Sequence, residues 1–423
     1  MKKHRHRCRE CANTWCIPSD RHLPHGKIPL MVKQLLIAGA GIGGMAAALA
    51  CARPGWAVRV FERATVLSEV GAGIQIGPNV TRLLHHWGLQ DALAAVAAFP
   101  SHLQVRDALT ARGLGHLGLG AAMQQRYGAP YATLHRADLL ALLHTAVQQT
   151  STQLQLDHGL QHFSQTPFGV AVRGSAAEEI DGDALVGADG LWSPVRQWLL
   201  HDGPPRSTGH LAYRALVRQA DLPHSLRSQH VTAWLGPHLH VVQYPVSGGD
   251  WLNVVAIVHG QLPPQHTSLE HWDHNANAAD LRTCLAGVCT PLQDLVQAVP
   301  SWRLWVLRDR PPMAGAHQQA QGRVALLGDA AHPMRPYLAQ GAGMAIEDAA
   351  ELATVLQSGS DIPAALAHFA RQRWRRNARV QARAIRNGRI YHATGLVRWS
   401  RDRAMQLGGE RLLDMPWLYG AGQ

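Results

Sequence analysis

The sequence predicts an α/β protein in which a Rossmann-type nucleotide-binding domain is interrupted by a β-sheet domain and followed by C-terminal helices. Three observations predict this arrangement. A strand–helix–strand pattern with closely spaced glycines lies near the start, a stretch of short strands rich in Val, Trp and Tyr follows, and strong helical patterns fill the last part of the chain. The 423 residues are enough for two or three lobes.

The strand–helix–strand pattern occupies residues 35–61. Residues 35–38 are a short apolar run typical of a buried strand, and residues 42–52 are rich in alanine and predict a helix. Gly55 ends that helix, and residues 57–61 form the next strand. Together these elements predict a βαβ unit at the start of a parallel sheet.

A G-x-G-x-x-G pattern made of Gly39, Gly41 and Gly44 lies between the first strand and the helix. Glycines there let the backbone turn tightly and approach a pyrophosphate, which the free N–H groups of the helix N-terminus can bind. Glu62 ends the second strand, where its carboxylate can accept hydrogen bonds from a ribose. The pattern predicts dinucleotide binding, and a simple packing turn between strand and helix is the alternative.

The remaining elements complete the two domains. Helices are predicted at residues 136–148, 342–357 and 362–390, and strands at 184–187 and 324–327. Between about residues 209 and 259 the pattern predicts a series of short strands. From this order we predict a nucleotide-binding domain at residues 31–205 and 310–375. The β-rich domain is predicted at residues 206–309 and the C-terminal helical segment at 376–423.

Residues 1–30 are predicted to be a disordered extension, because Met31 begins a typical start of its own. Three cysteines and two histidines in this segment weakly resemble a zinc knuckle: Cys8, Cys11, Cys16, His22 and His25. A structural zinc site needs four closed ligands and usually a second tight pair, so we expect no metal.

The net charge of +11 admits nucleic acid, a membrane surface or an anionic ligand as a partner. Residues 1–30 carry seven Lys/Arg and two Asp/Glu, so they supply +5 of it. Aromatic residues make up only 6% and do not alternate with the basic ones, which argues against nucleic acid. No apolar run is long enough for a stable membrane association, and the expected location is cytoplasmic.

Two later segments separate the possible dinucleotides. The strand at 184–187 leads through Asp189 to Arg196, and the strand at 324–327 leads through Gly328, Asp329 and His332 to Gly341. With the first glycine pattern, these segments resemble the single-component flavoprotein aromatic hydroxylases over about residues 33–420. The resemblance implies a Rossmann-type domain that binds FAD.

The resemblance also implies a role for each matching residue. Glu62 would bind the adenosine ribose, Arg136 would contact FAD, and Asp189 would lie in a segment used for both FAD and NAD(P)H. Asp329 would bind the ribityl chain, and the helix that begins at Gly341 and Ala342 would face the flavin. Arg63, next to Glu62, is a further candidate for contact with FAD. No second G-x-G-x-x-G pattern appears, so NADH or NADPH is expected to bind transiently.

The substrate residues are expected in the β-rich domain. His240 and Tyr244 are four residues apart, so in a strand they point to the same face. The segment around them resembles the 3-hydroxybenzoate 6-hydroxylases and 6-hydroxynicotinate 3-monooxygenases, where such a pair binds the substrate hydroxyl and helps to deprotonate it. Arg214 could bind a carboxylate. Tyr337 and Gln75 are expected to line the pocket; related branches carry Gln or His near Tyr337, which leaves the substrate open.

Structural explanations compete with these roles: a surface salt bridge for Arg214, and a stacked core histidine for His240. The favoured mechanism is a hypothesis in which NAD(P)H reduces FAD, O2 forms a C4a-hydroperoxyflavin, and oxygen is transferred to a ring activated through His240. The expected partners are a small aromatic substrate, NAD(P)H, O2 and a second copy of the chain. A 6-hydroxynicotinate or salicylate hydroxylase, or a flavin dehydrogenase or oxidase, is the alternative.

Overall fold

A largely parallel sheet organises the nucleotide-binding part of the computed structural model, which describes residues 32–67, 73–175, 178–260, 273–276, 278–359 and 361–420. In those residues its strand order is β18-β19-β11-β1-β2-β7. The central strand β1 (Gln34–Ala38) pairs in parallel with β2 (Ala57–Phe61) and β11 (Ala184–Gly187). The outer strands are β7 (Gln153–Gln155), β18 (Ala320–Gln321) and β19 (Val324–Leu326). The extension at residues 1–30 and its zinc pattern lie outside the described residues.

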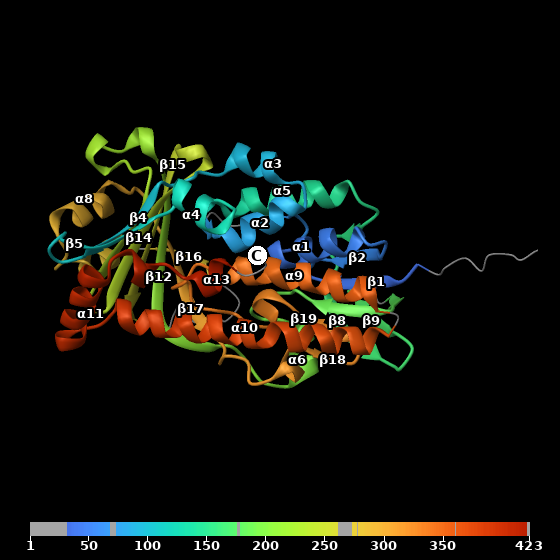
Figure 1. Ribbon diagram of the computed structural model, residues 1–423. Helices are drawn as coiled ribbons and strands as arrows, with labels where there is room; N and C mark the ends of the chain where they lie inside the picture. Colours follow the sequence, from blue (N-terminus) through green and yellow to red (C-terminus); the bar gives the residue numbers. More distant parts are fainter. Residues whose placement is uncertain are drawn as a thin grey trace, which may run out of the picture. The chain divides into compact units, whose positions relative to one another are not determined.

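Two helices pack closely beside this sheet, α1 (Ile42–Ala52) and α9 (Gly341–Ser358) (Figure 1). The small side chains of α1 permit the close approach. A Cβ built at Gly43 would come 2.8 Å from the Leu327 side chain and 3.3 Å from the Ala345 side chain. The expected helix at 136–148 is α5 (Arg136–Gln148), which also packs on α1. The predicted α/β fold is therefore confirmed.

A second, mainly antiparallel sheet forms the β-rich part. Its order in the described residues is β16-β17-β12-β15-β14-β13-β4-β5. The strands are β4 (His102–Asp107), β5 (Gly113–Gly118), β12 (Arg206–Arg218), β13 (Val231–Gly236), β14 (Leu239–Val246), β15 (Trp251–His259), β16 (Asp273–Asn275) and β17 (Arg303–Asp309).

The sheet does not follow the predicted segment 206–309 alone. β4 and β5 belong to the stretch 31–205 that the sequence assigned to the nucleotide-binding domain, and β4 joins the sheet through a parallel pairing with β13. Local sequence patterns carry no signal for a pairing between strands that are more than a hundred residues apart. The domain boundaries themselves stay a prediction.

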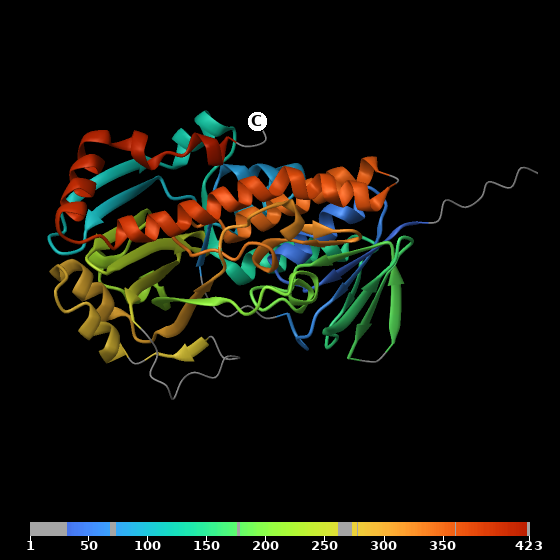
Figure 2. The same ribbon diagram turned by 90° about the horizontal axis from the view of Figure 1, so that it is seen from below.

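The two faces of this sheet have different partners. One face packs its apolar side chains against α7 (Ala278–Cys284) and α8 (Thr290–Ala298). The other face packs against Tyr337 and the end of α10 (Ile362–Tyr391). Figure 2 shows α7 and α8 in gold on one side of the sheet and the red helices on the other.

The long helix α10 extends from the first sheet to the second. The predicted boundary at 375/376 falls inside it, because the helical pattern continues without a break. After it come α11 (Gly395–Gly408), α12 (Glu410–Leu413) and α13 (Pro416–Tyr419). Smaller elements complete the described chain: α2 (Pro78–His86), α3 (Gln90–Val96), α4 (Gly120–Tyr127), α6 (Pro194–Leu200), β3 (Gly73–Ile76), β6 (Ala132–His135), β8 (Leu160–Gln165), β9 (Val170–Gly174) and β10 (Glu179–Gly182).

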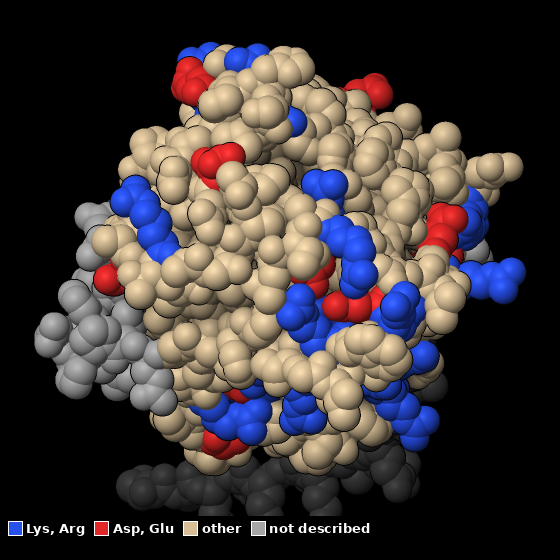
Figure 3. Space-filling model, turned by 90° about the vertical axis from the view of Figure 1, so that its left-hand side faces the viewer, with Lys and Arg blue, Asp and Glu red and all other residues tan. Residues whose placement is uncertain are grey.

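Charged side chains of both signs lie across the face drawn in Figure 3, where acidic groups lie among the basic ones. Within the described part of the chain, no helix has both the length and the apolar character needed to cross a bilayer.

Candidate active site

The three glycines of the G-x-G-x-x-G pattern lie between the end of β1 and the first turn of α1. The space around each of them is different. Gly39 has a φ of +96°, and a Cβ there would meet the Ala188 carbonyl oxygen at 2.5 Å. A Cβ at Gly44 would come 1.9 Å from the Gly39 carbonyl oxygen. At Gly41, no atom lies within 4 Å of an added Cβ. Gly39 and Gly44 are therefore needed for internal packing, whereas Gly41 leaves open space at the N-terminus of α1.

Glu62 lies over this turn. Its two carboxylate oxygens accept hydrogen bonds from the backbone N–H groups of Ala40 at 2.8 Å and Ala64 at 2.9 Å. Each oxygen keeps a further lone pair for a hydroxyl group. Arg63 is exposed beside it, and its charge reaches Asp189. Arg136 begins α5 and is half-buried.

Asp189 follows β11, which ends beside the glycine turn. Burial raises the pKa of Asp189 to about 6, against hydrogen bonds from the Ser193 hydroxyl and the Val195 N–H. The neighbouring Arg196 is buried and donates to the carbonyl oxygens of Ala330 and Ala331. Arg196 thus ties this segment to the loop that carries Asp329.

Asp329 and the N-terminus of α9 lie next to each other. The Asp329 side chain is exposed, and its Oδ1 is 4.0 Å from the position of a Cβ built at Gly341. No side chain caps the start of α9, where Gly341 and Ala342 present backbone N–H groups. An exposed carboxylate therefore lies beside a helix N-terminus that no side chain caps.

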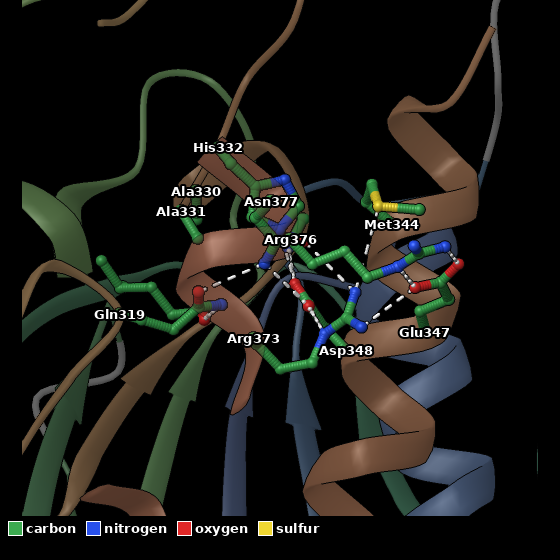
Figure 4. Close-up of polar contacts among 12 residues, drawn as sticks. Gln319, Ala330, Ala331, His332, Met344, Glu347, Asp348, Arg373, Arg376 and Asn377 are labelled. Atoms are coloured by element: carbon green, nitrogen blue, oxygen red, sulfur yellow. Dashed lines mark hydrogen bonds and ion pairs between the residues drawn. The ribbon is translucent and has the colours of Figure 1, made fainter. Parts of the chain in front are cut away.

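A buried network, here called the ionic network, holds α9 against α10: Glu347, Asp348, Arg373, Arg376 and Asn377 with His332 (Figure 4). The Arg373 guanidinium donates to Asp348 at 2.7 Å and Glu347 at 2.9 Å. The second Asp348 oxygen contacts His332 Nε2 at 2.5 Å. Since His332 lies in the loop between Asp329 and α9, the ionic network also positions that loop.

The sheet face that packs against α10 brings together most of the expected substrate residues. His240 and Tyr244 lie on β14 with Val242 between them on the same face, and Val242 pairs through Val255 with Arg214 on β12. Arg214 therefore lies between the cross-strand rows of His240 and Tyr244. The expected shared face of His240 and Tyr244 agrees with the strand register, which adds Arg214 to that face.

Tyr244 and Gln75 form a polar group at one end of this face. Tyr244 is buried, which raises its pKa, and its hydroxyl makes hydrogen bonds with Gln75 and Asn253 that act against the shift. The Tyr131 hydroxyl donates to Gln75 at 2.9 Å. A Cβ at Gly73 would come 2.7 Å from the Tyr244 ring, so the close approach of β3 requires this glycine.

Arg214 stacks on an aromatic ring rather than extending to the surface. Its guanidinium carbon lies 3.6 Å from the centre of the Trp305 ring. The side chain is half-buried, and its charge acts on Tyr244. A planar guanidinium held in this way suits bidentate recognition of a carboxylate.

His240 and Tyr337 belong to a group at the other end of the face. His240 Nδ1 lies 2.7 Å from His392 Nε2, and His392 Nδ1 lies 2.9 Å from His259 Nε2. The Tyr337 hydroxyl makes a hydrogen bond with His210 Nδ1. We call His210, His240, His259 and His392 the histidine cluster.

The histidine cluster lacks the charge balance of the ionic network. Burial, together with the charge of the nearby His210, lowers the pKa of His240 to about 3. The sequence predicts an imidazole that titrates near neutral pH, and this prediction is wrong for His240: the buried ring is a neutral hydrogen-bonding group at physiological pH. Sequence reasoning missed His210, His259 and His392, because strand register and a helix end bring them together.

Known proteins with similar sequences and folds identify the class. The family model described as an FAD binding domain matches residues 33–384. A 3-hydroxybenzoate 6-hydroxylase of Polaromonas naphthalenivorans is 37% identical over 390 residues, which cover 91% of this chain and 95% of that protein. A 6-hydroxynicotinate 3-monooxygenase of Bordetella bronchiseptica is 33% identical and covers 82% of this chain and 89% of its own. A solved salicylate hydroxylase substrate complex has a TM-score of 0.77 at 26% identity, over 92% of this chain and 95% of its own.

The chain is therefore an FAD-binding flavoprotein monooxygenase. More narrowly, it belongs to the family of NAD(P)H-dependent aromatic-ring hydroxylases, as the sequence had predicted. The residues present fit FAD: open space at Gly41 in front of a helix N-terminus suits a pyrophosphate, and Glu62 can accept from a ribose. An exposed Asp329 beside the uncapped α9 suits a polyhydroxyl chain and a ring that gains negative charge.

Proposed function

We propose that this enzyme hydroxylates a small benzoate that carries a ring hydroxyl, with 3-hydroxybenzoate as the first candidate. The observation that carries this proposal is the position of Arg214 between the rows of His240 and Tyr244 on one sheet face. A cation in the middle and hydrogen-bonding groups on either side match a ring with one carboxylate and one hydroxyl. The 37% identity to a 3-hydroxybenzoate 6-hydroxylase supports this choice.

We assign the FAD contacts as follows. The N–H groups at the start of α1, with Gly39, Gly41 and Gly44, bind the pyrophosphate, and Glu62 with Arg63 binds the adenosine side. Arg136 and Asp189 contact the cofactor from α5 and from the segment after β11, and Asp329 binds the ribityl chain. The start of α9 at Gly341 and Ala342 faces the flavin. When bound, FAD accepts hydride from NAD(P)H and activates O2 for transfer to the ring.

The protein side chains prepare the substrate for this chemistry. Arg214 binds the carboxylate, held in plane by Trp305. His240 accepts a hydrogen bond from the ring hydroxyl at Nε2, which raises the electron density of the ring and favours attack by an electrophilic oxygen. Tyr244 and Gln75 close one end of the pocket, and Tyr337 covers the flavin side. Burial of His240, Tyr244 and Tyr337 helps to exclude water from the reaction.

Oxygen uptake and NAD(P)H oxidation by the purified yellow protein test this proposal. The panel is 3-hydroxybenzoate, salicylate, 4-hydroxybenzoate and 6-hydroxynicotinate, with benzoate and phenol as controls that each lack one group. We expect 3-hydroxybenzoate to stimulate oxidation and to yield a hydroxylated product with little H2O2. Stimulation by 6-hydroxynicotinate instead would favour the pyridine branch. H2O2 as the only product with every compound would favour an oxidase and refute the proposal.

A glycine pair separates FAD binding from folding. In Gly41→Ala the new methyl group enters open space, so we expect wild-type thermal stability but FAD affinity reduced by about tenfold or more, or about 1.4 kcal/mol. In Gly44→Ala the Cβ must displace the Gly39 carbonyl, so stability and FAD binding fall together. Unchanged FAD affinity in Gly41→Ala would contradict the assigned pyrophosphate site.

We also propose that the chain forms a homodimer and is located in the cytoplasm. A homodimer is supported by exposed apolar side chains on α11, where Leu396 is 83% and Trp399 is 61% exposed. Light scattering at several protein concentrations measures the mass directly, and Trp399→Asp should lower it if this face forms the contact. A cytoplasmic location is proposed from the sequence alone.

A further inference from the structure

Three imidazoles of the histidine cluster converge from three elements that are far apart in the sequence. His210 comes from β12, His259 from the end of β15, and His392 directly follows α10. One ring nitrogen of each lies within 4.8 Å of the nitrogens of the other two. Among the residues that the structure describes, no other group of histidines, cysteines or carboxylates meets this spacing.

The hydrogen bonds leave one suitable nitrogen on each ring. His210 uses Nδ1 for the Tyr337 hydroxyl, and His392 uses Nε2 for His240. The remaining His392 Nδ1 faces His259 Nε2 at 2.9 Å. Tetrahedral zinc with Zn–N bonds of about 2.0–2.1 Å separates two ligand nitrogens by about 3.3 Å, so small ring movements suffice. Ligand histidines in metal sites characteristically bond a partner through their second nitrogen, as His210 and His392 do here.

Charge and exposure also suit a soft or borderline cation. Burial lowers the pKa of His210, His259 and His392, which favours the neutral imidazole, the form that binds metals. The carboxylate that acts on His210, Asp309, is already paired with Arg206 and Arg335. His259 is exposed while the other two are buried, so an ion can enter from solvent and keep a water ligand.

We propose that His210, His259 and His392 form a binding site for a zinc-class divalent cation. Neutral imidazole ligands without carboxylates favour Zn²⁺, Co²⁺, Ni²⁺ or Cu²⁺ over Mg²⁺ and Ca²⁺. The site is separate from the FAD contacts and from Arg214, and it touches the substrate side through the bond between His392 and His240.

Metal binding at this site changes what His240 offers to the substrate. A cation on His392 Nδ1 forces the His392 proton onto Nε2, which then donates to His240 Nδ1. His240 must then carry its own proton on Nε2, so that nitrogen donates a hydrogen bond instead of accepting one. The cation therefore inhibits hydroxylation; this second part rests on the proposed role of His240 in the reaction.

Zinc counting tests the site without any reference to catalysis. The full-length FAD enzyme is freed of metal with a chelator, dialysed against Zn²⁺ and analysed by mass spectrometry for bound zinc. His259→Gln removes an exposed ligand, and His224→Gln removes an exposed histidine of the same domain outside the cluster. We expect wild type and His224→Gln to hold one more zinc ion per chain than His259→Gln. Equal counts in all three proteins would overturn the proposal.

Two further measurements guard the result. His210→Gln removes a ligand from another strand and should lose the same ion, so a folding defect in one variant leaves the other decisive; FAD content reports folding. Co²⁺ replaces Zn²⁺ to identify the ligands. An ion held by imidazoles lacks the thiolate charge-transfer absorption that the cysteines of residues 1–30 would produce. If the Co²⁺ ion that is lost in both His259→Gln and His210→Gln shows thiolate absorption, the proposed histidine site is refuted.

Inhibition tests the link to His240. With the substrate found in the panel, Zn²⁺ should lower turnover of wild type and His224→Gln by about tenfold, the effect of one lost hydrogen bond of about 1.4 kcal/mol, and chelator should restore it. His259→Gln should be insensitive. A bound ion that leaves wild-type turnover unchanged would refute the coupling to His240, while the zinc count and the substrate panel would stand on their own results.

Discussion

The helix α10 touches two buried polar groups of opposite character. Near its middle, the ionic network surrounds Arg373 with Asp348 and Glu347, so every charge has an opposite charge within hydrogen-bond distance. Just after its C-terminal end, His392 belongs to the histidine cluster. There the hydrogen bonds join imidazoles to one another and to the Tyr337 hydroxyl. Both groups are largely buried, yet the first is built on pairs of carboxylates and guanidinium groups and the second on imidazoles whose pKa is lowered.

The difference follows from how burial and neighbouring charges together shift the pKa values in each group. Burial alone would raise the pKa of Asp348, but the charges of His332 and Arg373 outweigh it and hold that pKa far below its ordinary range. In the histidine cluster burial lowers the pKa of each ring, and neighbouring histidines add to the shift. A saturated network can only hold elements together, whereas neutral imidazoles keep lone pairs for a proton, a substrate or a metal.

Removing one charge from the ionic network is the largest expected effect on stability. Asp348→Asn leaves Arg373 with one carboxylate and His332 without an anion, so we expect a loss of about 3–5 kcal/mol in the free energy of unfolding. Urea unfolding of the FAD enzyme measures it. The exposed pair of Arg173 and Glu179 provides a matched control, since Glu179→Gln should cost less than about 1 kcal/mol. Similar losses in both variants would remove the distinction between the buried and exposed pairs.

Acid should weaken the ionic network in a defined range of pH. The pKa of Asp348 and that of Glu347 are lowered in the folded state, so their stabilising contribution is present above the ordinary carboxyl pKa of about 4. It is lost progressively as the pH falls further. The unfolding free energies of wild type and Asp348→Asn should therefore differ most at pH 7 and converge below about pH 4. A constant difference across the whole range would contradict the assigned charge states.

A change in the histidine cluster should affect stability least and turnover most. His240→Asn keeps a side-chain amide near the position of Nδ1 for His392 but removes Nε2, so the unfolding free energy should fall by only about 0.5–1.5 kcal/mol. Substrate-stimulated turnover should fall by about ten- to a hundredfold. Stopped-flow and steady-state kinetics separate this from weaker substrate binding. A variant with normal turnover would assign His240 to packing rather than to the reaction.

Local sequence patterns carried much of the fold. The predicted bounds 42–52, 57–61, 136–148 and 184–187 coincide with α1, β2, α5 and β11, because alanine-rich and apolar runs ended by glycines leave few alternatives. The spacing of His240 and Tyr244 likewise placed both on one strand face, where register brings in Arg214. The roles of these residues stay predictions.

What the sequence could not reveal depends on contacts between distant segments. His210, His259 and His392 each follow an ordinary local pattern, and only antiparallel register and the end of α10 bring them together. The low pKa of His240 has the same origin, since burial depends on the whole fold. Arg196 was visible in its motif, but its bonds to the Ala330 and Ala331 carbonyls need the folded loop.

Because β4 pairs in parallel with β13, the second sheet is built from two separate parts of the chain and cannot be exchanged as one continuous segment. A fragment limited to residues 206–309 would leave the edge of β13 without a neighbour, and such an unpaired edge invites aggregation. Recombination between relatives at those two points would likewise join a sheet from one parent to its edge strands from the other. Substrate preference in this fold is therefore more readily altered by point substitution than by exchange of a module.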